Sequence, residues 1–206
     1  MNRWIRNAAI IITALAIIGL PDPSNAETRD ETVQRLRERN KAERYQVPVE
    51  GHSIKAGGAR ILVNAPIATV RSVVQDYGNY ETFMPRFKRS RIVDKNDTAT
   101  QVYLQVPILH GAANVWSVVQ FGQPAKRADG SEVIRGRMVE SNVKDFRATW
   151  HLVPIDDRTT LLSAEILIVP SLPVPNSVVT GELEYASDMA VTSTAKRAEA
   201  QARAGK

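Results

Sequence analysis

The chain of 206 residues contains no cysteine. This absence excludes a disulfide, a thiolate nucleophile, a thiol-ligated zinc site and a lipid-modified N-terminal cysteine. Histidine is also scarce, because only His52, His110 and His151 occur, and they form no H-x-H or HExxH pattern. A metal site needs several ligands that converge, so the sequence predicts neither a metal nor a cofactor.

The excess of basic over acidic residues is also small. The chain has 27 basic and 22 acidic residues, for a net charge of +5, and the charges are dispersed. This balance does not indicate nucleic-acid binding, although it allows a weak contact with anionic membrane surfaces. The glycine-based patterns of serine hydrolases, P-loop proteins and dinucleotide-binding proteins are absent too. A hydrophobic content of 43% predicts one packed domain.

The first 26 residues have the pattern of a secretion signal. Arg3 and Arg6 precede an apolar run over residues 8–20, and Ala26 ends a pattern of small residues that a signal peptidase recognises. The apolar run is shorter than the ~20 residues that span a bilayer. We therefore expect a signal peptide over residues 1–26, cleaved after Ala26, in preference to a retained anchor. Export across the inner membrane would place the protein in the periplasm of a Gram-negative cell.

Residues 27–46 are dense in charge, and their apolar side chains are Val33, Leu36 and Tyr45. The pattern predicts a solvated lead-in helix that docks loosely on the domain. A helix that binds a partner or a membrane surface is the alternative. Its polar face mixes both charge signs, which disfavours membrane binding.

The domain proper, residues 47–200, begins with one strand and two short helices. Apolar residues predict a strand over 59–63, and Pro66 ends it because proline fixes its own φ and restricts the preceding residue. Apolar spacing then predicts a helix over 67–74. A second short helical segment carries Tyr80, Phe83 and Met84 into a proline.

About six strands are expected after these helices. Apolar and polar residues alternate over 99–106 and 146–152, and the longest apolar strand covers 159–169. Turn signals separate the candidates at short intervals, which predicts an antiparallel meander.

A proline-rich segment over 170–175 ends the sheet, and residues 176–203 read as one long helix. Beyond Thr194 no large apolar residue remains, so we expect the end of this helix to fray, with residues 201–206 as a tail. The predicted fold is therefore α+β. A curved antiparallel sheet of about seven strands wraps around the long C-terminal helix, and such an arrangement tends to enclose a cavity.

Four motifs within residues 57–197 are similar to one known family. They are Val63-Asn64-Ala65-Pro66, Asp76-Tyr77-x-x-Tyr80-x-x-Phe83-Met84-Pro85, Trp150-His151-Leu152-x-Pro154 with Thr159-Thr160, and Pro170-x-Leu172-Pro173-x-Pro175. With these motifs the chain resembles the START-like superfamily (helix-grip, SRPBCC-type), in the branch of coenzyme-Q-binding and polyketide cyclase/dehydrase-like proteins. The resemblance implies the helix-grip scaffold and leaves the ligand open. The secretion signal departs from the coenzyme-Q-binding type and disfavours a mitochondrial or cytosolic quinone role.

The candidate ligand-binding residues are those expected to surround the cavity of this fold. Tyr80, Phe83 and Met84, with the loop at 107–111, are the expected entrance. Each aromatic residue has plain core packing as its alternative role. The candidates are Tyr80, Phe83, Met84, Tyr103, His110, Trp116, Trp150, Glu165, Tyr185 and Met189.

The favoured hypothesis is an exported protein that binds a hydrophobic small molecule, such as a lipid, an isoprenoid, a sterol-like compound or a quinone. It requires no catalytic residue, and none is assigned. The alternative is a cyclase or aromatase that uses His110, Tyr103 or Glu165 as acid or base in the same cavity. Export disfavours this enzyme, because the resemblance implies substrates bound to carriers in the cytosol. A scaffold that acts through residues 27–46 is a third reading.

Overall fold

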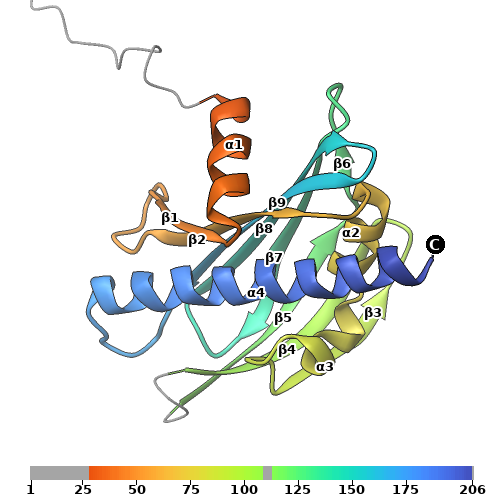
Figure 1. Cartoon of the computed structure of the whole chain (residues 1–206). Helices are drawn as coiled ribbons and strands as arrows, with labels where there is room; N and C mark the ends of the chain where they lie inside the picture. Colours follow the sequence, from red (N-terminus) through yellow and green to blue (C-terminus); the bar gives the residue numbers. More distant parts are fainter. Residues whose placement is uncertain (1–27, 109–112, 206) are drawn as a thin grey trace, which may run out of the picture.

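The computed structural model describes residues 28–108 and 113–205, and it has the predicted α+β architecture (Figure 1). A nine-stranded antiparallel sheet has the order β1-β2-β9-β8-β7-β5-β4-β3, and β6 pairs with β7. The strands are β1 (Glu43–Val47), β2 (Ala56–Val63), β3 (Arg89–Lys95), β4 (Ala99–Ile108), β5 (Ala113–Gly122), β6 (Ala125–Lys126), β7 (Glu132–Ser141), β8 (Asp145–Asp156) and β9 (Thr159–Val169). The helices are α1 (Arg29–Arg39), α2 (Ile67–Val74), the 3-10 helix η2 (Tyr77–Asn79), α3 (Tyr80–Phe83) and α4 (Asn176–Ala204).

The helix-grip arrangement is thus confirmed, with two short strands, β1 and β6, beyond the seven expected. The sheet curves behind α4, which crosses its concave face (Figure 1). The helices between β2 and β3 close one end, where Val70, Val73 and Val74 of α2 are fully buried. The residues of this apolar stripe recur at three- and four-residue spacing, so one face of α2 packs into the core.

The helix α4 approaches β2 closely because the contacting residues are small. Gly57 has no side chain to hold the helix away, and the Ser187 hydroxyl donates to the Gly57 carbonyl at 2.8 Å. Farther along the helix, Ala190, Ala195 and Ala198 are buried. This close approach fixes α4 over the β2–β9 side of the sheet.

The C-terminal end of α4 does not fray as expected, since the helix continues to Ala204. Alanines bury well at a close helix contact even without large side chains, and charged neighbours add tertiary bonds. Arg197 pairs with Asp76 at 2.5 Å, and the Glu199 carboxylate accepts the backbone N–H of Asn64 at 2.9 Å. The prediction of fraying was wrong because it considered only the size of the apolar side chains and not the tertiary partners of Arg197 and Glu199.

The lead-in segment forms a helix over only part of its expected length. A capping box between Thr28 and Glu31 begins α1, and Asn40, in the left-handed conformation with φ of 50°, ends it. The following residues form β1, in which Tyr45 is half-buried between exposed neighbours. Val33 and Leu36 anchor α1 to the domain, because both are buried. No helix within 28–108 or 113–205 is both long and apolar enough to cross a bilayer.

Candidate functional site

Three small cavities lie between the concave face of the sheet and α4. The central cavity, of about 70 Å³, is lined by Met84, Pro85, Arg86, Phe87, Leu104, Val106, Val115, Ser117, Phe146, Ile166, Ile168, Ala186, Met189 and Ala190. The inner cavity, of about 40 Å³, is lined by Tyr80, Met84, Phe87, Leu104, Phe121, Phe146, Ala148, Thr149, Trp150, Ala164, Glu165, Ile166 and Ala190. The outer cavity, of about 60 Å³, is lined by Val115, Ile168, Pro170, Val174, Val178, Val179, Glu182 and Leu183.

The three cavities form one tract, because neighbouring cavities share their walls. Six residues border both the central and the inner cavity: Met84, Phe87, Leu104, Phe146, Ile166 and Ala190. Val115 and Ile168 border both the central and the outer cavity. Small side-chain shifts therefore suffice to join the cavities, and methionine, with its flexible unbranched side chain, adapts readily to such shifts.

Strand alternation supplies the apolar lining. On β4, Leu104 and Val106 point to the concave face, and on β9 Ile166 and Ile168 do the same. On α4 the lining residues Ala186, Met189 and Ala190 recur at three- and four-residue spacing, so they lie on one face of the helix. The small alanines leave the space that the cavity occupies.

Among the described lining residues of the central cavity, Arg86 and Ser117 carry the polar side chains. The Ser117 hydroxyl is already satisfied, because it donates to the Glu140 carbonyl at 3.2 Å. The Arg86 guanidinium donates to the Glu182 carboxylate at 2.9 Å, and its central carbon lies 4.5 Å from the centre of the Tyr185 ring. Arg86 thus links the segment after α3 to α4 at the edge of the cavity.

Five of the predicted site residues border this tract, and Glu165 is described separately below. Met84 and Met189 line the central cavity, while Tyr80 and Trp150 line the inner one. The Tyr80 hydroxyl donates to the Val74 carbonyl at 2.5 Å, and complete burial raises the pKa of Tyr80 well above its usual value. Tyr80 is therefore a neutral, internally bonded part of the wall.

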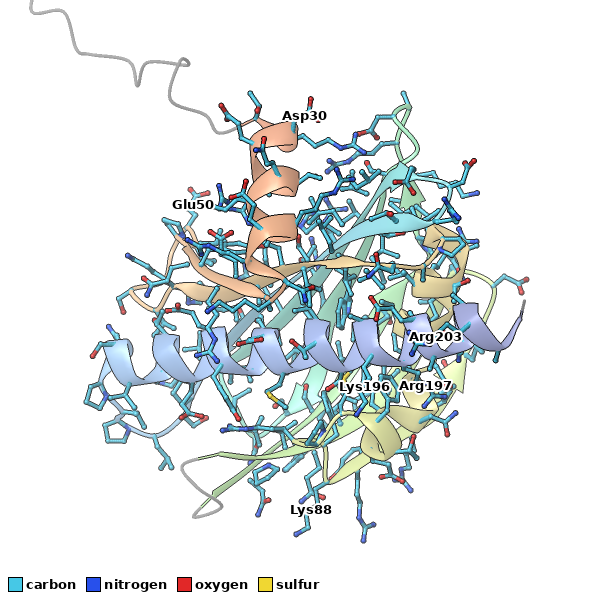
Figure 2. The ribbon with its side chains drawn as sticks, viewed as in Figure 1. Asp30, Glu50, Lys88, Lys196, Arg197 and Arg203 are labelled. Carbon is cyan, nitrogen blue, oxygen red and sulfur yellow. The ribbon has the colours of Figure 1, made fainter. Side chains whose placement is uncertain are left out.

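Phe83 lies beside the tract, where its ring packs edge-on against Tyr80 with 5.7 Å between ring centres. The guanidinium of Arg197 on α4 lies 4.4 Å from the centre of the Phe83 ring. Figure 2 shows Arg197 on α4 next to Lys196. This contact holds α3 against the long helix.

Tyr103 and Trp116 lie on the opposite, convex face of the sheet. Their rings stack with centres 6.2 Å apart, and Arg91 lies 5.3 Å from the Tyr103 ring centre. Strand alternation is the reason, since their neighbours Leu104 and Val115 face the cavity. Tyr103 and Trp116 were predicted to border the cavity, and this prediction is wrong because their side of the sheet points outward. Tyr185 also lies outside the three linings, where Arg44 and Arg86 approach its ring.

Glu165 borders the inner cavity, but its carboxylate belongs to a polar cluster with Tyr45 and His151. The Tyr45 hydroxyl donates to Glu165 at 3.1 Å, and His151 Nε2 lies 3.8 Å from the other carboxylate oxygen. His151 lowers the pKa of Glu165 against the opposing effect of burial, and Tyr45 adds to the lowering. Burial, followed by the Glu165 charge, raises the pKa of Tyr45.

His110 and the expected signal peptide lie outside the described residues. Within the described part of the chain, no group of three or more His, Cys, Asp or Glu residues is placed to hold a metal ion. Sequence reasoning missed Arg86 and Glu182, which are distant in sequence and meet only in the fold. The proline before Arg86, which ends the second short helix, was the available signal that this segment turns back toward the domain.

A curved sheet that grips a long helix over an apolar cavity is the architecture of START-like domains. The family model described as "Polyketide cyclase / dehydrase and lipid transport" matches residues 63–203, and the chain belongs to this family. Comparison with curated proteins gives no match.

Solved structures share this fold at low sequence identity. A STAR-related lipid transfer protein from Xanthomonas axonopodis has 19% identity and a TM-score of 0.64, over 79% of this chain and 93% of that one. Human StAR-related lipid transfer protein 5 has 13% identity and a TM-score of 0.66, over 82% and 92%. An aromatase/cyclase from a Streptomyces species has 17% identity and a TM-score of 0.51, over 79% and 94%.

Proposed function

We propose that the protein binds and carries a hydrophobic small molecule, such as a lipid or an isoprenoid, between the sheet and α4. The observation that carries this proposal is the tract of three adjoining cavities with an almost wholly apolar lining. Removing apolar ligand surface from water supplies about 25 cal/mol per Å². Sites for small molecules are typically apolar and concave, with few polar groups, which fits this tract.

Binding requires the cavities to merge and widen. Their separate volumes of about 40 to 70 Å³ are far below the ~300–1,000 Å³ of typical ligand sites. The shared walls contain Met84 and Phe87, both on the segment after α3. Displacement of this segment joins the central and inner cavities, so it is the entrance that we assign.

An acid–base enzyme in the same cavity is less well supported. Such chemistry needs an ionisable group within reach of the substrate. Tyr103 lies on the convex face, and the Glu165 carboxylate is engaged by Tyr45 and His151. An aromatase/cyclase shares this fold, so the fold does not separate an enzyme from a carrier. The cavity residues favour the carrier.

The proposal includes export and a membrane contact. The basic start, the apolar run and the small residues before position 27 support a cleaved signal. Leu172 and Val178 support the contact, because their side chains are 59% and 46% exposed and Val178 borders the outer cavity. N-terminal sequencing of the secreted protein tests export, and an intact Met1 would contradict cleavage.

The carrier function is tested by filling the cavity. Native mass spectrometry of the purified protein, with lipid extraction, should recover a bound hydrophobic molecule. Ala186→Phe places a ring in the central cavity and should weaken binding by tenfold or more, which corresponds to about 1.4 kcal/mol. Ala200→Phe on an exposed part of α4 is the matched control and should bind normally. Repeated recovery without ligand, together with no lipid uptake, would contradict the proposal.

A further inference from the structure

We infer that the Arg86–Glu182 pair selects the ligand by its head group, and that the ligand is an amphiphile with one anionic head and an apolar tail. The inference rests on the proposed function and specifies the chemistry of the same site. It makes Arg86 the residue that binds the head, and Glu182 the internal anion that the head replaces.

The first observation is the position of the pair. Arg86 lines the central cavity and Glu182 lines the outer cavity, so the ion pair stands where the two cavities adjoin. The other described lining residues of these two cavities are apolar, except Ser117, whose hydroxyl is already bonded. A polar group buried without a partner is costly, so a ligand with a polar head is stable in this part of the tract only at the pair.

The second observation is the unused capacity of Arg86. Its guanidinium makes one hydrogen bond within the described chain, from Nη1 to Glu182. A guanidinium carries five N–H donors in a planar fork that suits a carboxylate or a phosphate. The side chain is 32% exposed, so an incoming head group can reach it.

The third observation is that, among residues 28–108 and 113–205, Arg86 has a second support and Glu182 has none. The Tyr185 ring, 4.5 Å from the guanidinium carbon, holds Arg86 when the carboxylate leaves. Glu182 is 37% exposed and can turn into solvent, where a carboxylate is well hydrated. Exposed ion pairs are weak, so exchange of Glu182 for a ligand anion is inexpensive. A cationic head would instead leave Arg86 facing a like charge.

The exchange also explains how a long tail is accommodated. Arg86 lines the central cavity and Glu182 lines the outer one, so a head group bound at Arg86 lies between the two cavities. From this position the tail can extend into the apolar part of the tract.

The test compares three ligands with the same tail. Oleate, oleyl alcohol and oleylamine are titrated against the purified full-length protein, with displacement of an apolar fluorescent dye as the readout. Oleate should bind about tenfold more tightly than oleyl alcohol, and oleylamine should bind least tightly. Equal affinity for the three, or a preference for oleylamine, overturns the inference. Failure of all three to bind counts against the carrier function itself.

Variants assign the preference to the pair. Arg86→Gln should abolish the preference for oleate, so that oleate and oleyl alcohol bind with similar affinities. Glu182→Gln should raise the affinity for oleate, because the competing anion is gone. Arg44→Gln is the matched control, since Arg44 also approaches Tyr185 but lines none of the three cavities. An unchanged preference in a folded Arg86→Gln protein overturns the inference.

Discussion

Gly57 on β2 lies directly beneath Leu183 on α4. A Cβ atom at Gly57 would stand 2.2 Å from the Leu183 carbonyl carbon and 2.1 Å from the backbone nitrogen of Glu184. Backbone atoms cannot give way as a flexible side chain can, so the sheet and the helix would have to separate. This contact sets the height of α4 above the cavity tract.

Gly57→Ala should therefore lower the free energy of unfolding by about 3 kcal/mol, as for overpacked cores. Gly181→Ala is the matched control on α4, because no atom lies within 4 Å of the added Cβ. It should raise the free energy of unfolding by about 1 kcal/mol, since alanine favours helix over glycine. Urea unfolding measures both. Equal effects of the two substitutions would contradict the close approach.

Arg197→Ala should lower the free energy of unfolding by about 1 to 2 kcal/mol. The substitution removes the ion pair to Asp76 at 2.5 Å and the contact with the Phe83 ring. Lys196→Ala, which changes an exposed neighbour on α4 (Figure 2), is the control and should have little effect. If the two variants unfold at the same urea concentration, Arg197 does not hold α3 in place.

The free energy of unfolding should fall in acid, in part because Glu165 becomes protonated. Its folded-state pKa is lowered from the ordinary value of 4.5, so its contribution is complete above pH 4.5 and is lost as pH falls through the folded-state pKa. Glu165→Gln should be less stable than the unchanged protein at pH 7 and should show a flatter dependence in acid. Glu140→Gln on β7 controls for net charge. Parallel stability curves for the unchanged protein and Glu165→Gln would contradict this role.

Aspartate at both Leu172 and Val178 should slow transfer of a fluorescent lipid between vesicles several-fold. A charge at these exposed positions opposes contact with an apolar membrane interior, while it disturbs no buried packing. Val139→Asp is the control, because Val139 is 53% exposed on β7 and lines none of the cavities. Unfolding in urea should not distinguish the double variant from the control. Equal transfer rates would place the membrane contact elsewhere.

Much of the fold was predictable because its signals are local. Pro66 separates a strand from a helix, and the alternation around Phe146 and Trp150 identifies a strand with one buried face. β1 was missed because its charged residues read as a continuation of the helix, and the left-handed Asn40 that ends α1 is not distinctive in sequence. The end of α4 was misjudged because Arg197 and Glu199 find partners far away in the chain.

The site was predictable only in part, since strand alternation states which residues share a face but not which face is inward. Tyr103 was predicted to border the cavity, yet its neighbour Leu104 lines the cavity and Tyr103 points to the convex side. Met84 and Met189 were found because Met84 follows α3 and Met189 lies on the gripped helix α4 itself. The Arg86–Glu182 pair forms because α4 lies close to the segment after α3. A single sequence does not show that these two segments meet.

The order of the elements in the chain means that the sheet can be covered only at the end of folding. β2 pairs with β9, so that Val63 lies opposite Thr160, and the helix that covers both comes last. The apolar face of the sheet therefore has no covering helix until the last element is made, and uncovered apolar surfaces promote aggregation. We therefore expect aggregation to compete with folding until α4 is available to cover the sheet.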